Sequence, residues 1–182
     1  SGLSAIEELR DIMGRQAPLV YIFGPPGSGK TNFALLLAQL YKRKHETAIL
    51  GSNIRSWEES DKWIPNYSTL DTWLSEAVIE QQDGQKRRDD DARNRLFVFD
   101  EASSHASGRG KQGYEAGQKL APMTYQIRKS NGAMIIVGHD GRDVHPAVRE
   151  LATVVQRFRG ELKRAVLWQD VRNRQGEGKM AE

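Results

Sequence analysis

The segment GPPGSGKT contains glycines, a lysine and a threonine at spacings that suit the binding of a polyphosphate. Gly24, Gly29, Lys30 and Thr31 match the pattern G-x-x-x-x-G-K-[ST] in full. Glycines let backbone N–H groups turn onto phosphate oxygens, the lysine ammonium reaches the β- and γ-phosphates, and the threonine hydroxyl ligates Mg²⁺. The pattern therefore predicts a site for Mg²⁺ and a nucleoside triphosphate, made by the consecutive residues Gly24, Pro25, Pro26, Gly27, Ser28, Gly29, Lys30, Thr31 and Asn32.

Two adjacent carboxylates follow an apolar run in the segment LFVFDE. We expect Asp100 to hold Mg²⁺ through its water shell, and Glu101 to polarise the water that attacks the γ-phosphate. The alternative for Glu101 is a carboxylate that starts a helix. Because the sequence has no N-K-x-D motif for reading guanine, ATP is the expected nucleotide. A small-molecule kinase stays open, although the Asp-Glu pair favours hydrolysis.

These two segments need a scaffold that brings them together. Helical patterns separate four apolar runs of strand length, at 18–24, 47–53, 95–101 and 132–140. One of these helices is predicted over 68–82, with Ser68 or Asp71 as its cap. Continuous apolar strands that alternate with helices indicate an α/β fold, in which a mainly parallel sheet is covered on both faces. Two late strands, at 153–158 and 162–171, can form a hairpin.

The organisation of the chain is predicted in three parts. A helix is expected over 1–17, an ATPase domain over 18–170 and a flexible tail over 171–182. A length of 182 residues suits one domain with a sizeable core.

Composition narrows the class of protein only broadly. The net charge of +3 and the pI of 9.2 permit a polyanionic partner without requiring one. No apolar run approaches the ~20 residues of a membrane-spanning helix. The absence of cysteine excludes disulfides and thiolate metal sites. We expect a cytoplasmic protein.

The segment IRKSNGAMIIVGHDGRDVHPAVRE adds to the phosphate-binding loop and the Asp-Glu pair. It resembles a segment of the FtsK–HerA superfamily, in which an Arg and a Gly precede a strand that ends in a polar sensor. This superfamily includes DNA pumps, viral genome-packaging ATPases and the Zot-like ATPases of filamentous viruses. The segment GSNIRSW is similar to a Thr-Asn-hydrophobic segment of the Zot-like branch. The resemblance covers roughly residues 18–158 and implies a RecA-like P-loop NTPase fold.

The resemblance also implies roles for residues outside the two motifs. It places at Arg128 an arginine that completes the active site of a neighbouring subunit, with Arg149 and Arg157 as lesser candidates. The alternative for Arg128 is a solvated cation at the end of a helix. The sensor falls at the end of the fourth strand, where the family usually has Gln and this sequence has His139 followed by Asp140. Either side chain is a candidate for contact with the γ-phosphate or its water.

The function implied by the resemblance is ATP hydrolysis in an oligomeric DNA motor, of the genome-packaging or Zot-like kind. The expected partners are further copies of the chain in a ring, by resemblance a hexamer, and DNA bound without sequence specificity, in the host cytoplasm if the protein is viral. The basic loop 107–113 is a candidate DNA contact or else an ordinary surface loop.

Three alternatives remain open. They are a monomeric P-loop ATPase that does not translocate, a small-molecule phosphotransferase, and an AAA+ ATPase that lacks its lid. The roughly thirty residues after Leu151 read as strands and tail rather than as a helical lid. They therefore argue against the AAA+ class unless the chain is truncated.

Overall fold

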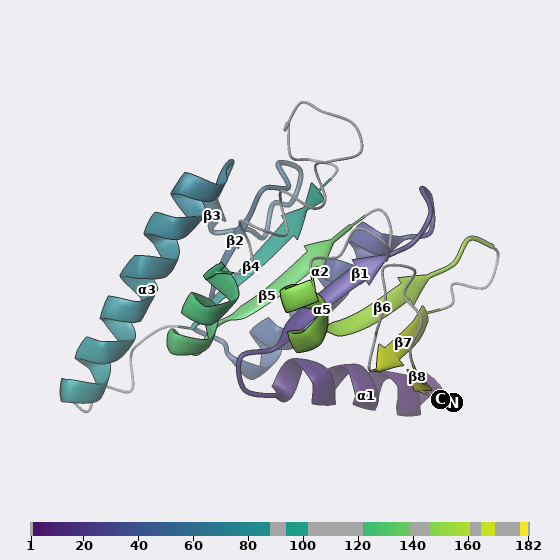
Figure 1. Cartoon of the computed structure of the whole chain (residues 1–182), viewed down its shortest axis with the longest axis horizontal. Coiled ribbons are helices and arrows are strands. Elements are labelled where there is room, and N and C mark those ends of the chain that lie inside the picture. The colour runs from purple at the N-terminus through teal and green to yellow at the C-terminus, as the bar shows by residue number, and fades with distance from the viewer. Residues whose placement is uncertain are drawn as a thin grey trace.

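The computed structural model describes residues 2–87, 94–101, 122–138, 146–160, 165–169 and 179–181. These segments form a central sheet with helices packed on it (Figure 1). The helices are α1 (Gly2–Gly14), α2 (Lys30–Lys44), α3 (Tyr67–Arg87), a helix at 122–129 and α5 (Pro146–Leu151). The strands are β1 (Leu19–Phe23), β2 (Ile49–Ser52), β3 (Lys62–Trp63), β4 (Arg95–Asp100), β5 (Ala133–Val137), β6 (Thr153–Arg157), β7 (Ala165–Gln169) and β8 (Lys179–Ala181).

The sheet confirms the predicted α/β architecture. Within the described residues it has eight strands in the order β3-β2-β4-β5-β1-β6-β7-β8. All neighbours from β3 to β6 pair in parallel, which gives the RecA-like arrangement with β1 between β5 and β6. The predicted hairpin is also confirmed, because β7 pairs antiparallel with β6. Part of the expected tail, Lys179–Ala181, forms β8 on the free edge of β7, where unpaired backbone groups can accept another strand.

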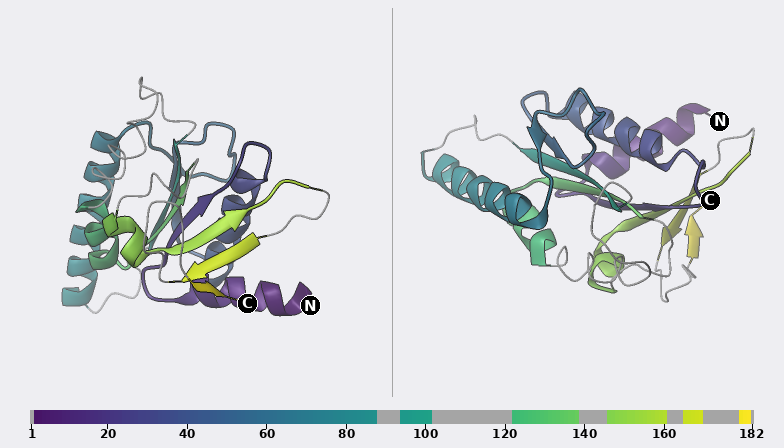
Figure 2. Two further views of the ribbon diagram at one scale, coloured as in Figure 1. Left: turned by 45° about the vertical axis from the view of Figure 1, so that its right-hand side comes forward. Right: turned by 90° about the horizontal axis from the view of Figure 1, so that it is seen from above.

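Helices cover both faces of the sheet, as expected for strands that are apolar throughout. Figure 2 shows α1 and α2 on one face, and α3, the 122–129 helix and α5 on the other. The alternation of side chains along β1 supplies both layers, because Val20 and Ile22 join the core under α2 whereas Tyr21 and Phe23 join the core under α3. Every residue of β4 and β5 is buried, so these central strands are fixed from both sides.

The start of α3 differs from the sequence prediction. The helix begins at Tyr67, and the Asn66 side-chain oxygen accepts a hydrogen bond from the Thr69 backbone N–H at 2.9 Å. Asn66 therefore caps the helix in place of Ser68 or Asp71, because its short carbonyl side chain lies just before the first turn. The helix also continues beyond the predicted end at residue 82, to Arg87.

Candidate nucleotide-binding site

The loop between β1 and α2 has the backbone conformation that its glycines predict. Gly24, Gly27 and Gly29 have φ values of 154°, 80° and 79°, in the region that side-chain-bearing residues rarely adopt. A Cβ added to Gly24 would lie 2.5 Å from the backbone oxygen of Arg157 on the neighbouring strand β6. The loop ends at Lys30, the first residue of α2, so the positive end of this helix faces the turn. We call residues 24–31 the P-loop.

The side chain of Lys30 bridges the P-loop and the end of β5. Its Nζ donates to the backbone oxygen of Gly24 at 2.8 Å and to that of Gly138 at 3.2 Å. Burial lowers the pKa of this ammonium, while the carboxylates of Asp100 and Glu101 partly oppose the shift. The lysine is thus held at the mouth of the loop, between the two segments that the sequence assigned to phosphate and sensor.

The predicted metal-binding pair comes together. The hydroxyl of Thr31 donates to the carboxylate of Asp100 at 3.5 Å, although the two residues are 69 positions apart. Asp100 is buried at the carboxyl end of β4, where the parallel sheet brings it to the same edge as the P-loop. Within the described residues there is no cluster of three or more His, Asp or Glu side chains that suits a metal ion. A single carboxylate and a hydroxyl fit Mg²⁺, which keeps most of its waters and takes further ligands from phosphates.

Asn53 fixes the position of Asp100 and was not identified as a site residue from the sequence. Its side chain pairs twice with the backbone of Asp100, with Nδ2 donating to the carbonyl at 2.8 Å and Oδ1 accepting from the N–H at 2.8 Å. Both residues are buried. The only sequence signal was the Thr-Asn-hydrophobic resemblance at this position, where Ser52 stands in place of threonine. Its hydroxyl donates to Val98 on β4 at 2.7 Å.

Glu101 follows β4 directly and is partly buried. Its carboxylate lies near enough to Lys30 and to Tyr67 to influence both groups: it opposes the lowering of the lysine pKa and adds to the burial that raises the pKa of Tyr67 above its usual range. Tyr67 stands at the start of α3, with its ring 5.6 Å from that of Phe99. The carboxylate that was assigned to the attacking water therefore lies in the same site as the P-loop lysine.

The P-loop also contains a polar group suited to a phosphate ligand. The hydroxyl of Ser28 is buried and has no hydrogen-bond partner among the described residues. A buried hydroxyl without a partner is unfavourable by about 1–3 kcal/mol, and a phosphate oxygen would supply the missing partner. Together with the glycine conformations and Lys30, this hydroxyl fits a polyphosphate ligand, and Thr31 and Asp100 are the residues that would hold Mg²⁺.

Two arginines of the same chain contact the backbone of the P-loop from the side of β6. Arg157 is buried, and its Nε donates to the backbone oxygen of Ser28 at 3.2 Å. The exposed Arg159 donates through Nε to the backbone oxygen of Pro26. The sequence suggested Arg157 only as a lesser candidate for a neighbour's site. The signal that was missed is topological, because β6 pairs in parallel beside β1 and therefore ends next to the P-loop.

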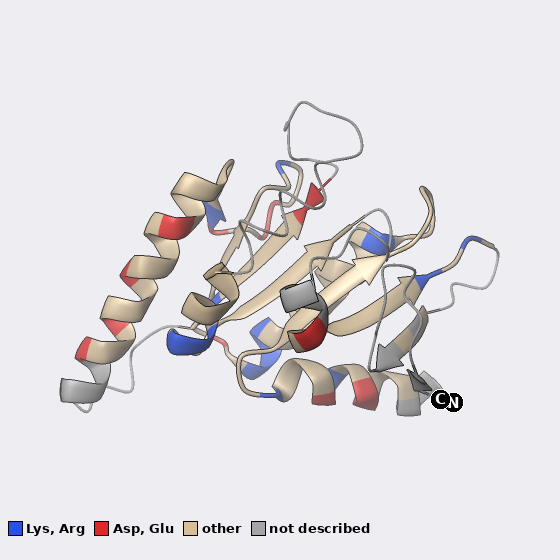
Figure 3. Ribbon diagram, in the orientation of Figure 1, with Lys and Arg blue, Asp and Glu red and all other residues tan. Residues whose placement is uncertain are grey.

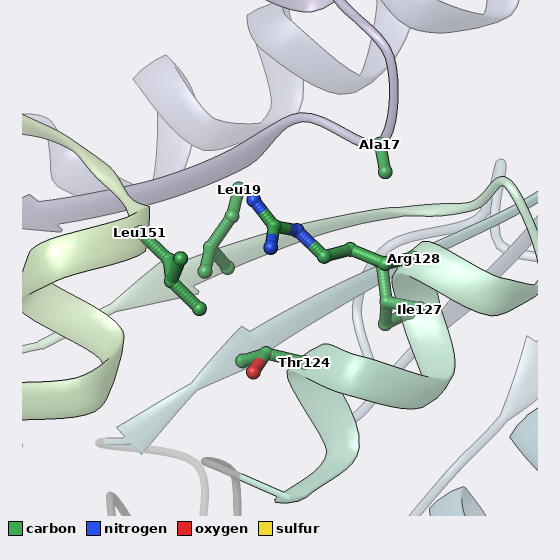
Figure 4. Close-up of a pocket in the computed structure, with 6 residues that line it drawn as sticks. All are labelled: Ala17, Leu19, Thr124, Ile127, Arg128 and Leu151. Atoms are coloured by element: carbon green, nitrogen blue, oxygen red, sulfur yellow. The ribbon is translucent and has the colours of Figure 1, made fainter.

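Arg128 lies near the amino ends of the parallel strands, opposite to their carboxyl ends and the P-loop. It is exposed at the end of the 122–129 helix and lines a small cavity with Leu19, the first residue of β1, with Ala17, just before β1, and with Leu151, the last residue of α5, just before β6 (Figure 4). The P-loop follows the carboxyl end of β1. The structure therefore does not bring Arg128 to the phosphate site of its own chain.

The remaining candidates fall outside the described residues. They are His139, Asp140 and the loop 107–113, as well as the side chain of Arg149. Gly138, immediately before His139, is described and receives the hydrogen bond from Lys30. The residue just before the segment predicted to carry the sensor thus contacts the P-loop lysine.

Comparisons with known proteins support the fold. The structure is similar to the cytoplasmic domain of the type VII secretion ATPase EccC of Thermomonospora curvata, with a TM-score of 0.55 and 13% identity over 86% of this chain and 23% of that chain. It is also similar to the N-terminal domain of zonular occludens toxin from Neisseria meningitidis, with a TM-score of 0.52 and 14% identity over 85% of this chain and 84% of that chain. The fold is therefore that of P-loop ATPases. No protein-family model and no curated protein sequence matches the chain.

None of the helices in the described part of the chain is both long and apolar enough to cross a membrane.

Proposed function

We propose that the chain binds and hydrolyses ATP with Mg²⁺ as one subunit of an oligomeric DNA motor of the FtsK–HerA superfamily, of the genome-packaging or Zot-like kind. The observation that carries the nucleotide part is the contact of Thr31 with Asp100, because it joins the two halves of a nucleotide site from distant parts of the sequence. Lys30 and the P-loop N–H groups bind the phosphates. Thr31 and Asp100 would hold Mg²⁺, which would neutralise charge that develops on the phosphoryl oxygens.

Glu101 is assigned to the attacking water. It follows Asp100 directly, so both residues lie at the carboxyl end of β4, but their side chains leave the backbone at different positions. A carboxylate within reach of the water orients it and accepts its proton. His139 or Asp140 is retained as the sensor of the γ-phosphate, since Gly138 immediately before them contacts Lys30.

The oligomeric part of the proposal is supported by the location of Arg128. Its guanidinium lies at the amino edge of the sheet, whereas the nucleotide site lies at the carboxyl edge. An arginine in this position serves the phosphate site of an adjoining subunit rather than its own. Where such an arginine acts in other NTPases, it accelerates hydrolysis by roughly 10³–10⁵.

DNA is proposed as the polyanionic partner. The net positive charge and the basic loop 107–113 support backbone contacts without sequence specificity. The similarity to the zonular occludens toxin domain extends over most of both chains and agrees with the sequence resemblance to the Zot-like branch. The competing candidate is a monomeric ATPase or phosphotransferase, with no role for DNA.

The test is ATP turnover by the wild type and Lys30→Ala, each with and without duplex DNA. We expect DNA to raise turnover in the wild type, and the stimulation to fall as salt rises because the release of counterions from DNA then gains less free energy. Lys30→Ala should lose at least about a hundredfold in turnover under all conditions, since a preorganised charge on the phosphates is removed.

Each part of the proposal has its own contrary result. The monomeric ATPase would be supported if DNA does not change wild-type turnover and light scattering gives the mass of one chain, 20.5 kDa, both with and without a non-hydrolysable ATP analogue. Transfer of the γ-phosphate to a small molecule would support the phosphotransferase. Turnover in Lys30→Ala equal to that of the wild type would reject the nucleotide site itself.

A further inference from the structure

The guanidinium of Arg157 is a buried charge beside the P-loop. The residue is 6% exposed. Its Nε donates to Ser28, and its guanidinium carbon lies 5.0 Å from the centre of the Phe33 ring in the first turn of α2. Within the described residues it forms no ion pair with a carboxylate. Burial lowers the pKa of this group.

The second buried arginine of the described residues shows how this fold otherwise accommodates such a charge. Arg95, at the start of β4, lies 3.0 Å from the carboxylate of Glu80 and 3.7 Å from that of Glu76, and it also donates to the backbone oxygen of Trp73. A buried charge that lacks such partners is costly. Among the described residues, Arg157 therefore differs from Arg95 in having no carboxylate as a partner.

The location of Arg157 makes an unpaired positive charge more unfavourable. It lies at the amino end of α2, where the helix dipole is positive and disfavours a cation. Lys30 adds a second positive charge to the same loop. Figure 3 shows basic residues both at the start of α2 and at the end of β6, at the carboxyl edge of the sheet. Several positive groups around one glycine loop fit a ligand with more than one negative charge.

We propose that Arg157 is a second cationic group of the nucleotide site, supplied by the same chain, whose charge is compensated by the phosphates of a bound nucleoside di- or triphosphate. Its hydrogen bond to Ser28 holds the P-loop in the conformation that receives them. This inference rests on the proposed function. Arg159 offers a matched control, because it also donates to the P-loop but is exposed, and water screens its charge.

The experiment compares thermal unfolding and ligand affinity of the wild type, Lys30→Ala, Arg157→Met, Arg157→Lys and Arg159→Met, with Mg-ADP and with pyrophosphate as probes. Without ligand, Arg157→Met should unfold at the same temperature as the wild type or higher, because a buried charge without an anion is replaced by an apolar side chain. Its affinity for both probes should fall by about tenfold to a hundredfold, the size of a charge-assisted hydrogen bond. Arg157→Lys should recover part of that affinity, and Arg159→Met should stay within about twofold of the wild type because exposed charges contribute little.

The outcomes separate the two proposals. If the wild type binds Mg-ADP and Lys30→Ala does not, but Arg157→Met binds both probes with unchanged affinity, the role of Arg157 is rejected and the nucleotide site stands. A loss confined to Mg-ADP would place Arg157 at the ribose or base and contradict the phosphate assignment. If Arg157→Met both unfolds earlier and binds weakly, recovery of affinity in Arg157→Lys supports the charge, and no recovery assigns Arg157 to packing alone. If the wild type binds neither probe, both proposals are rejected.

Discussion

Asp100 is constrained by its backbone and by its carboxylate at the same time. Asn53 occupies both backbone groups of this residue, and Thr31 contacts the side chain. Glu101 is the next residue in the chain, so the backbone position of Asp100 also fixes the backbone position of Glu101. The two neighbouring acids consequently have different environments, since Asp100 is buried against the P-loop whereas Glu101 is partly exposed. This difference is the basis for assigning them different roles.

Substitution at these two positions should separate the two roles. Glu101→Gln should bind ATP with near-normal affinity but hydrolyse it more slowly by roughly a hundredfold to ten-thousandfold, because an amide does not accept the proton of the attacking water. Asp100→Asn should instead raise the Mg²⁺ concentration required for half-maximal turnover. Titration of Mg²⁺ in a steady-state ATPase assay, with nucleotide affinity measured separately, distinguishes the two effects. Wild-type turnover in Glu101→Gln would move the base to His139 or Asp140.

Site residues could be predicted from the sequence where a motif is contiguous. Lys30 and Thr31 belong to one eight-residue pattern, and Asp100 and Glu101 close one apolar run, so each set is recognised without knowledge of the fold. Asn53 and Arg157 could not be assigned in this way. Their partners lie 47 and 129 positions away, and only the pairing of β2 with β4 and of β1 with β6 brings them together.

At the scale of elements, α2 is fixed at both of its ends. Its first residues form the P-loop, and its last turns pack on the segment before β4. There the Nδ2 of Asn94 lies 3.1 Å from Nδ1 of His45, whose ring is 4.6 Å from that of Tyr41. The strands and helices of this core could be predicted, because their apolar periods are local. The cap of α3 and the pairing of β8 could not, because Asn66 competes with equally suitable neighbours and β8 depends on an edge formed by distant residues.

Alkaline conditions test the packing of α2. Burial raises the pKa of Tyr41 from 10.0 to about 12, with Asn94 partly opposing the shift. The folded state therefore keeps a proton that the unfolded chain loses, so this stabilisation is complete below pH 10.0 and is lost as the pH rises through about 12. Relative to Tyr41→Phe, the wild type should lose about 2 kcal/mol of unfolding free energy between about pH 9 and about pH 11.5.

Urea unfolding of both proteins at the two pH values gives this difference directly. The phenylalanine variant is the control for other tyrosines and lysines, which titrate equally in both proteins. Its cost from leaving Asn94 without the phenol is the same at each pH. A difference between the two proteins that does not change with pH would contradict the burial of the Tyr41 hydroxyl.

At the scale of the whole molecule, different groups lie at the two ends of the parallel strands, which we call the carboxyl edge and the amino edge of the sheet. The carboxyl edge holds the P-loop, Asp100 and Glu101, and the amino edge holds Arg128 (Figure 4). If the amino edge of one subunit meets the carboxyl edge of the next, the contact is head-to-tail, and repeated head-to-tail contacts form a ring when the rotation between subunits closes. A site divided in this way would hydrolyse ATP only when a neighbouring subunit is present.

The most direct test of an active site shared between subunits is ATP turnover after mixing Arg128→Ala with Glu101→Gln. Each variant alone should bind ATP but hydrolyse it slowly. Arg128→Ala lacks the arginine that a subunit contributes to its neighbour's site, and Glu101→Gln lacks the base in the subunit's own site. In an equal mixture, random pairing places an intact Glu101 against an intact Arg128 at about a quarter of head-to-tail interfaces. We therefore predict that turnover recovers toward about a quarter of the wild-type value. Absence of any recovery, together with wild-type turnover strictly proportional to protein concentration, would show that the site is complete in a single chain and would contradict a shared active site.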